Sequence, residues 1–395
     1  MAKKIRGRNE GSIHQRSNGT WRVQIYIDGK RVGKTFRLKA EAQAWLRKMQ
    51  HQFDLGFDIQ AGGISLSEYL SDWLENSRSA LQSTTIYQYR NVINKHIVPF
   101  IGEIALKDLT LARVERLYGQ LLENNCGVRT VRITHSILHC ALEKAVKYNM
   151  VVRNVAHGAA LPKYQHAEMK VLDETQVTQF LAASSGSHYE ALFYLAAQTG
   201  MRQGELFGLK WTDIQWYSGV LQVQRQVKRP PGEAWKFADP KTQAGRRTIQ
   251  LGERTLQVLR EHRERQNVMK AASGASWQEH GLIFPNSVGS PGDSSNLRKE
   301  FYRVLELGGL PKIRFHDLRH TAATLMLNYG VSPIVVSKIL GHSKPSVTMD
   351  IYGHLLFGMQ AEAAKLMDRL LAPIPVGEVL DLKPNREKQN SHSVR

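Results

Sequence analysis

Residues 199–206 read Thr-Gly-Met-Arg-Gln-Gly-Glu-Leu and follow an apolar run at residues 192–197. The apolar run is typical of a buried helix, and Gly200 is the kind of residue at which a helix ends in a left-handed turn. The turn is expected to present Arg202, with Glu205 bracing its guanidinium or a nearby backbone amide. An arginine after a helix is by itself an ordinary surface residue, so this stretch has to be weighed together with others.

A second stretch dense in reactive side chains, residues 315–321, reads Phe-His-Asp-Leu-Arg-His-Thr. His316 and Arg319 are three residues apart, so on a helix they share one face. His316 and His320 have the spacing of a zinc-binding pair, but no Glu follows His316 and no cysteine lies nearby. We therefore predict no metal here and expect His320 to be packed or hydrogen-bonded within its own helix.

The third stretch leads to a tyrosine. Ser332, which a proline follows, predicts the start of a short helix, and Gly341 predicts its end, which places His342 at the helix exit. Ser346 is expected to cap the next helix and so to bring Tyr352 to the same neighbourhood. Because the chain has 13 tyrosines, only the position of Tyr352, ten residues after His342, singles it out.

Taken together, the three stretches resemble the tyrosine recombinases, or phage-type integrases. The residues that match the family pattern are Thr199-Gly200-x-Arg202-x-x-Glu205, His316-x-x-Arg319-His320, Leu340-Gly341-His342 and Tyr352. Pro240-Lys241-Thr242, followed by Arg246-Arg247, resembles the hairpin that carries the family's lysine. The chain departs from the pattern at Gly245, where many members have serine, and at Asn154-Val155, where the linker often reads Asn-Pro. Ordered motifs over about 150 residues are more specific than any one of them.

The resemblance implies a site-specific recombinase that integrates and excises a phage genome or mobile element. The catalytic residues that it implies are Arg202, Lys241, His316, Arg319, His342 and the nucleophile Tyr352. Attack on a DNA phosphate would leave a 3′-phosphotyrosyl bond, which another 5′ hydroxyl can reverse without ATP, so no cofactor or metal is expected. Between residues 314 and 354 the only acids are Asp317 and Asp350, too few for a two-metal nuclease.

The positive groups have separate tasks in this chemistry. Arg202 and Arg319 can each direct a fork of N–H donors at phosphate oxygens of the transition state. Lys241 can protonate the departing 5′ oxygen. By the resemblance, His316 assists proton transfer from the tyrosine, and His342 donates a hydrogen bond to the phosphate.

The chain of 395 residues carries a formal net charge of +19, and residues 1–50 alone carry +10. Such a surplus indicates a polyanionic partner, because cationic side chains release counterions from nucleic acid. DNA is favoured, and an anionic membrane surface is the second choice. The chain has two cysteines and no apolar run near the roughly 20 residues of a membrane span. We expect a soluble protein of the bacterial cytoplasm, associated with the nucleoid.

Within the basic region, residues 21–27 alternate between apolar and polar side chains, which predicts a half-buried strand. Asn18-Gly19 before it and Asp28-Gly29 after it predict hairpin turns, and apolar residues at helical spacing follow. A three-stranded sheet backed by one helix is expected, with one face free to enter a DNA major groove. The DNA-binding residues expected on that face are Arg16, Arg22 and Arg31. The alternative is a solvated basic tail.

The predicted fold class is multidomain α+β. The sheet and helix are followed by an all-helical bundle, in which the second helix closes at Pro99, and by a mixed, mainly helical domain with a small sheet. In that sheet, residues 220–227 are predicted to form one strand paired with residues 247–251. The predicted domains are 1–57 for arm-type DNA binding, 58–63 as linker, 64–160 for core binding, 161–170 as linker, 171–372 for catalysis and 373–395 as a polar tail.

The domain order resembles that of lambda-type integrases, which implies further partners. Residues 64–160 and 171–372 would clamp a core-type site on double-stranded DNA, and residues 1–57 would hold arm-type sites. The helix at residues 360–371 would dock on a neighbouring protomer, which implies a homotetramer on two paired sites. A host DNA-bending protein and an excisionase are further partners that the resemblance suggests. Two alternatives stay open, a type IB topoisomerase that acts as a monomer and a DNA-binding repressor whose catalytic residues are relics.

Overall fold

The computed structural model describes residues 11–27, 30–54, 63–164, 169–230, 232–240, 243–353, 364–365 and 367–371. It falls into two compact units, which divide between Ala167 and Glu168 apart from residues 230–232. That division lies inside the predicted linker at residues 161–170, and the other domain limits stay predictions. Lys241, the Asp28-Gly29 turn and residues 360–363 lie outside the described ranges. No helix within those ranges combines the length and the apolar composition of a membrane span.

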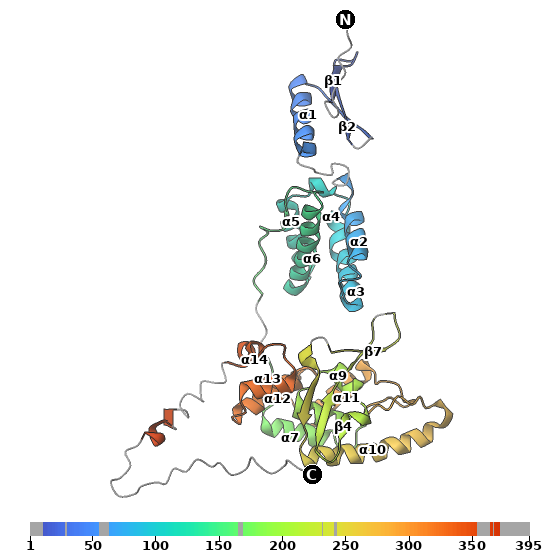
Figure 1. The fold of residues 1–395 in the computed structure, drawn as a ribbon, viewed down its shortest axis with the longest axis vertical. Coiled ribbons are helices and arrows are strands. Elements are labelled where there is room, and N and C mark those ends of the chain that lie inside the picture. The colour runs from blue at the N-terminus through green and yellow to red at the C-terminus, as the bar shows by residue number, and fades with distance from the viewer. Residues whose placement is uncertain are drawn as a thin grey trace, which may run out of the picture. The chain divides into compact units, whose positions relative to one another are not determined.

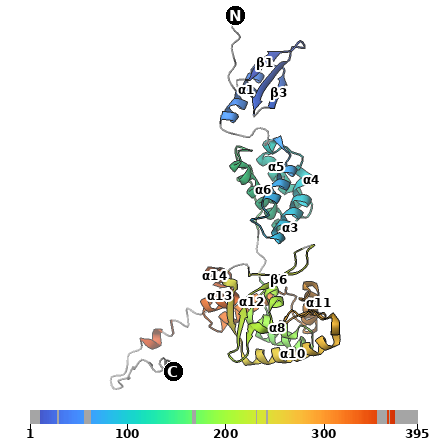
Figure 2. The ribbon, with the colours of Figure 1, turned by 45° about the vertical axis from the view of Figure 1, so that its right-hand side comes forward.

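The N-terminal part of the first unit is an antiparallel sheet with one helix beside it (Figures 1 and 2). Its elements, with strand order β1-β2-β3, are β1 (Ser12–Gln15), β2 (Trp21–Ile27), β3 (Lys30–Phe36) and α1 (Lys39–Asp54). Val23 and Ile25 of β2 and Ala42 of α1 are fully buried, because alternate side chains of β2 face the helix. Gly19, with a φ of 80°, makes the first hairpin turn. The predicted sheet backed by a helix is confirmed.

The rest of the first unit is a helical bundle, as predicted. Its elements are α2 (Leu66–Asn76), α3 (Ser83–Val92), the π-helix η2 (Ile93–Ile97), α4 (Val98–Ile101), the 3₁₀ turn η3 (Leu106–Asp108), α5 (Leu111–Glu123) and α6 (Val128–Lys147). Ser65 caps α2, since its Oγ accepts from the backbone N–H of Glu68 and the Glu68 carboxylate accepts from the N–H of Ser65. Leu70, Leu117 and Leu138 bring α2, α5 and α6 to a shared core.

Pro99 does not close the second helix, and that prediction was wrong. A π turn at Ile93–Ile97 precedes the proline, and α4 begins one residue before it, at Val98. The N–H of Val98 donates to the carbonyl oxygen of Ile93, five residues back. Pro99 therefore lies in the first turn of a new helical segment, where a residue with a fixed φ and no N–H is tolerated.

The second unit is a mainly helical domain with two small sheets. Its helices are α7 (Glu174–Ala183), α8 (Glu190–Thr199), α9 (Gln203–Gly208), α10 (Glu253–Ser273), α11 (Ser294–Leu307), α12 (Asp317–Asn328), α13 (Pro333–Leu340) and α14 (Pro345–Tyr352), and its 3₁₀ turns are η4 (Trp211–Asp213), η5 (Gln243–Gly245) and η6 (Gly274–Ser276). The paired strands are β4 (Ile214–Gln215), β5 (Val220–Val223) and β8 (Arg247–Gln250) in one sheet, and β6 (Gln226–Lys228) and β7 (Lys236–Ala238) in the other. This architecture confirms the predicted α+β fold class.

Residues 220–227, predicted as one strand, form two. β5 pairs with β8 as expected, whereas β6 pairs with β7. The break falls at Arg225, whose Nη1 contacts Oδ2 of Asp213 at 2.5 Å and the carbonyl oxygen of Gly208 at 3.3 Å. Asp213 is buried, so its negative charge needs a partner such as Arg225. The ion pair interrupts the strand at a place where the alternation of side chains alone predicts one continuous strand.

The last helices of the second unit form a series of contacts that begins at α8. α12 packs against α8, and α13 packs against α12 and α14 (Figure 2) and also against β8. α14 begins at Pro345 with Lys344 as its N-cap residue, so Ser346 does not cap it as predicted. A proline at the first helical position sets the φ angle that the helix needs. The packing brings the three sequence stretches together in space.

Candidate active site

A glycine turn between α8 and α9 presents Arg202. Gly200 ends α8 with a φ of 61°, and a Cβ atom there would lie 2.5 Å from Cδ2 of Leu340. Glycine satisfies both constraints at once. Arg202 then occupies the N-cap position of α9, with its side chain 42% exposed. The predicted turn is confirmed, and it leaves the guanidinium accessible to a ligand from solvent.

Glu205 holds two arginines from a buried position. Its carboxylate accepts hydrogen bonds from Nη1 of Arg202 at 2.8 Å, from the backbone N–H of Arg202 at 3.1 Å and from Nη2 of Arg247 at 2.9 Å. Burial by itself would raise the pKa of Glu205, but the charges and hydrogen bonds of Arg247 and Arg202 outweigh it and lower the pKa. The carboxylate is therefore ionised, and it braces Arg202 as predicted.

Arg247 is a site residue that the sequence pattern did not single out. Its side chain is almost fully enclosed, and besides its bond to Glu205 its Nε donates to the carbonyl oxygen of Ile339 at 2.6 Å. These contacts connect β8 with α9 and α13. In the sequence, only the pair Arg246-Arg247 pointed to this residue. A strand pattern does not show whether an arginine side chain is buried or lies at the surface.

Arg319 is a buried cation with an unused donor. Its side chain comes from α12, and its Nη1 donates to the carbonyl oxygen of Gly200 at 2.8 Å. Its Nη2 is also buried and has no hydrogen-bond partner among the residues that the structure describes. Burial, followed by the charge of Arg202, lowers the pKa of Arg319 to about 9, which leaves it protonated at neutral pH. A buried, unsatisfied, charged donor is costly unless a ligand completes it, so this position favours an anion.

Tyr352 and His320 form a hydrogen-bonded pair between α14 and α12. Tyr352 is 2% exposed, and its Oη lies 2.6 Å from Nδ1 of His320. Burial raises the pKa of Tyr352 to about 12, although the charge of Arg319 opposes this, and burial lowers the pKa of His320. The hydroxyl therefore donates to a neutral ring. His320 was expected to be packed or hydrogen-bonded within its own helix. Its ring is partly buried, but its hydrogen bond goes to the tyrosine of another helix.

Two further histidines lie at the ends of helices in this site. His342 follows Gly341, whose φ is 70°, and its Nδ1 is 2.8 Å from Oγ1 of Thr348. His316 is the N-cap residue of α12, and its ring centroid lies 5.5 Å from that of His320. Desolvation first, and then nearby positive charges that include Arg202, lower the pKa of each histidine to about 4. Both are neutral at physiological pH and can exchange protons through hydrogen bonds.

The hairpin predicted to carry the lysine is described only at its flanks. Lys241 lies outside the described residues, so the prediction for this side chain is neither supported nor opposed by a contact. Gly245 is buried in η5, and a Cβ atom there would lie 2.4 Å from Cβ of Pro240. A side chain at position 245 would therefore require Pro240 to shift.

A cavity of about 430 Å³ opens beside His316. Its lining includes Arg298 and Arg314, and also Gln203, the residue after Arg202. Nη2 of Arg314 pairs with Oδ1 of Asp317 at 2.7 Å, which offsets its charge, and Arg298 adds positive character to the lining. The arrangement offers room for an anionic ligand longer than a single phosphate group.

On the N-terminal sheet, the strand register places Arg22 and Arg31 on one face, the one opposite to the buried Ile25. Nη2 of Arg31 donates to Oε1 of Gln24 on the neighbouring strand. Arg16 is exposed in the turn that follows β1. The three arginines thus lie on or beside the sheet face that α1 does not cover, and their contact with DNA stays a prediction.

Two family models match the chain. The model described as "Phage integrase family" matches residues 170–359, and "Phage integrase, N-terminal SAM-like domain" matches residues 65–122. A protein named "Tyrosine recombinase XerC-like", from Caldanaerobacter subterraneus subsp. tengcongensis, is 29% identical over 378 residues, which span 89% of this chain and 96% of the relative. An integrase of Streptomyces ambofaciens is 29% identical over 384 residues, which span 93% of this chain and 98% of the relative.

The fold is similar to those of solved integrases. The Tn1549 transposon integrase in complex with a circular intermediate DNA gives a TM-score of 0.66 at 20% identity, over 78% of this chain and 99% of that one. A lambda integrase dimer bound to a COC′ core site gives 0.57 at 17% identity, over 89% and 96%. A lambda integrase tetramer bound to a Holliday junction gives 0.55 at 18% identity, over 87% and 97%.

Proposed function

The chain belongs to the phage integrase family of tyrosine recombinases, and on that premise we propose that it cuts and rejoins DNA at specific sites through Tyr352. The reaction integrates and excises a phage genome or another mobile element. The observation that carries the proposal is the convergence of the site's side chains. Arg319 on α12 donates to the carbonyl oxygen of Gly200 in the turn that presents Arg202, and His320, the next residue on α12, is hydrogen-bonded to Tyr352. Nucleophile, phosphate-binding cations and proton-exchanging rings therefore belong to one site.

The two arginines supply the phosphate site. Arg202 is partly exposed and is oriented by Glu205, while Arg319 is fixed by the carbonyl oxygen of Gly200. A DNA phosphate gives Nη2 of Arg319 the acceptor that no described residue provides. The two fixed positive charges then stabilise the additional negative charge of the pentavalent transition state.

His320 is placed to receive the proton of the nucleophile. A tyrosine with a pKa of about 12 attacks slowly unless a base accepts its proton, and Nδ1 of the neutral His320 already accepts its hydrogen bond. As the tyrosine oxygen bonds to phosphorus, its proton passes to His320, and the departing 5′ oxygen takes a proton from Lys241. His316 assists through its contact with the ring of His320, and His342 donates a hydrogen bond to the phosphate.

A nicked suicide DNA that carries the core site tests the proposal as a whole. Attack releases a short strand and traps the protein on the DNA, and mass spectrometry of the proteolysed adduct should locate the phosphotyrosyl group at Tyr352. The adduct should form equally well with EDTA present, because the proposed mechanism uses no metal. Cleavage without an adduct, or an adduct lost in EDTA while thermal melting shows the protein still folded, would overturn the mechanism.

Replacing His320 should slow the cleavage step. We expect His320→Gln to lower the single-turnover cleavage rate at pH 7 by about 10²-fold or more, the effect of losing a general base. The wild-type rate should fall as the pH drops through the lowered pKa of His320, because the protonated ring accepts no hydrogen bond. The glutamine variant should lack this limb of the pH profile.

His51→Gln, a change at an exposed position in α1, is the matched control. Unchanged or faster cleavage would mean that the pair only holds the tyrosine in place.

The N-terminal sheet is proposed to bind separate arm-type sites. Deleting residues 1–57 should abolish gel shifts of arm-site DNA and spare adduct formation at the core site, because the uncovered arginine face is lost while the catalytic unit stays intact. The double variant Arg22→Ala, Arg31→Ala in the full-length chain should also bind arm-site DNA more weakly. Equal loss of arm binding and core cleavage on deletion would show that the domain boundary is misplaced.

The working assembly is proposed to be a homotetramer on two paired core sites. Met367, Leu370 and Leu371 near the end of the described chain are exposed apolar side chains, which suits docking on a neighbouring protomer. Pairing of two sites separates a recombinase from a type IB topoisomerase, which acts on one site as a monomer, and the suicide-DNA adduct separates it from a repressor. A host DNA-bending protein and an excisionase remain proposed partners.

A further inference from the structure

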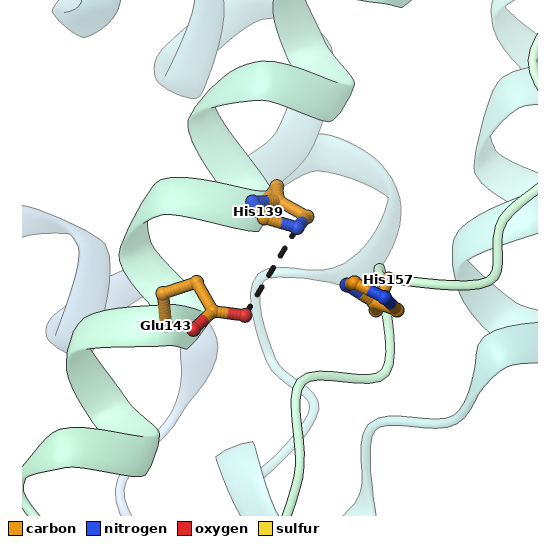
Figure 3. Close-up of side chains that lie close together, drawn as sticks. All are labelled: His139, Glu143 and His157. Carbon is orange, nitrogen blue, oxygen red and sulfur yellow. Dashed lines mark ion pairs between the residues drawn. The ribbon is translucent and has the colours of Figure 1, made fainter.

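Three side chains of the helical bundle that can bind a metal ion lie together, in the first unit of the chain, whereas the catalytic residues assigned to recombination belong to the second. Figure 3 shows His139 and Glu143 on α6 and His157 on the segment that follows it, with all three side chains directed at a common point. One ligand atom from each lies within 4.8 Å of the others. Nε2 of His139 and Oε1 of Glu143 are 4.0 Å apart. The three residues are called the His–Glu–His cluster below.

The backbone around the cluster is built to keep these residues together. His139 and Glu143 are four residues apart on α6, so they share one helix face. The side chain of Asn154 fixes the following segment to that face, since its Nδ2 donates to the carbonyl oxygen of His139 at 3.0 Å and to Oε1 of Glu143 at 2.8 Å. Its Oδ1 accepts from the N–H of the buried Ala156 at 2.9 Å, and His157 comes next in the chain.

Asn154 therefore has the place of an outer-shell residue at a metal centre. It orients one ligand, Glu143, and positions the backbone that carries another, His157. A simple i, i+4 ion pair between His139 and Glu143 needs neither the asparagine nor the second histidine. The presence of both, held by three hydrogen bonds, is what distinguishes the cluster from an ordinary surface pair.

We propose that the His–Glu–His cluster binds a zinc ion. Two imidazoles and one carboxylate are a donor set that Zn²⁺ accepts, with water as the fourth ligand. Tetrahedral zinc with bonds of the usual length places neighbouring ligand atoms about 3.3 Å apart. His139 and Glu143 are only partly buried and His157 is exposed, so small side-chain rotations bring their ligand atoms from the present separations to that spacing.

A bound ion would fasten the segment after α6 to the helix itself. His157 belongs to the stretch through which the chain leaves the bundle, and the same stretch is held again where Nη1 of Arg132 donates to the carbonyl oxygen of Pro162 at 3.1 Å. Zinc would thus add a cross-link between two parts of one unit that the sequence places 14 to 18 residues apart. Its effect is on the stability of the bundle and not on the bonds that recombination breaks.

Zinc binding to the full-length chain, stripped of metal with a chelator, tests the proposal. Calorimetric titration with Zn²⁺ and melting curves with and without Zn²⁺ give affinity and stabilisation, because a ligand of the folded state raises the melting temperature. His157→Gln and Glu143→Gln should each weaken zinc binding by about 100-fold or more and abolish the zinc-dependent rise. Glutamine at position 143 keeps an oxygen that can accept from Asn154, so the fold around it is preserved.

His51→Gln removes an exposed histidine from α1 and is the matched control, so it should bind zinc as the wild type does. Co²⁺ replaces Zn²⁺ as a spectroscopic probe, and its visible absorption should report nitrogen and oxygen ligands in the wild type and change in His157→Gln. Mg²⁺ should give no rise in melting temperature. Absence of zinc binding in the wild type, or equal affinity in His157→Gln and the wild type, would overturn the proposal, since any zinc would then be held by other side chains.

Discussion

Tyr352→Phe should abolish the covalent adduct on suicide DNA while DNA binding persists. The substitution removes the one oxygen that attacks phosphorus and leaves the arginines of the phosphate site in place. Phenylalanine fits the buried position, and the lost hydrogen bond to His320 should cost only about 1 kcal/mol of folding free energy. Denaturing gels measure the adduct, gel shifts on core-site DNA measure binding, and thermal melting checks that the variant is folded.

Tyr329→Phe is the matched control for this experiment. Tyr329 also stands at the C-terminal end of a helix in the same unit, but it is exposed and its hydroxyl contacts Glu174 on α7. Its variant should form the adduct at the wild-type rate. An undiminished adduct in Tyr352→Phe would remove Tyr352 as the nucleophile, and loss of adduct in both variants would point to a general defect of the domain.

Residues that fix the local backbone were readable from the sequence. Gly200 and Gly341 each stand where an apolar helical run ends, and both adopt positive φ, so the turns that present Arg202 and His342 follow from the chain alone. The alternation at residues 21–27 likewise fixes which side chains of the N-terminal sheet face its helix. In each case the pattern that predicts the local structure lies within a few residues of the position whose conformation it determines.

Features that depend on distant partners could not be read in this way. The strand break at Arg225 depends on the buried Asp213, and the inward position of Arg247 depends on Glu205, 42 residues earlier in the chain. The bond between His320 and Tyr352 joins two helices that only their packing brings together. The prediction that Pro99 ends a helix was wrong because the π turn at Ile93–Ile97 places this proline in the first turn of a new helix. Local sequence patterns predict a helix and its ends, but they do not predict which polar side chains form hydrogen bonds or ion pairs with a distant element.

Arg319→Gln should lower the rate of adduct formation by about 10³-fold or more. The change removes a fixed positive charge and the unused Nη2 donor from the place where the transition state gains negative charge. The melting temperature, in contrast, should stay the same or rise. The reason is that the substitution replaces a buried cation that lacks a full set of partners with a neutral group. Single-turnover cleavage and thermal melting of the same samples measure the two quantities.

The divergence of the two measurements is what makes the experiment decisive. Arg303→Lys, a conservative change at an exposed arginine paired with Glu300, should alter neither the cleavage rate nor the melting temperature. If Arg319→Gln lost activity in step with a falling melting temperature, the arginine would be holding α12 to the Gly200 turn through its bond to the carbonyl oxygen, and its role would be structural. A slow but stable variant would show that the protein keeps an incompletely paired cation because the DNA phosphate supplies the missing partner during the reaction.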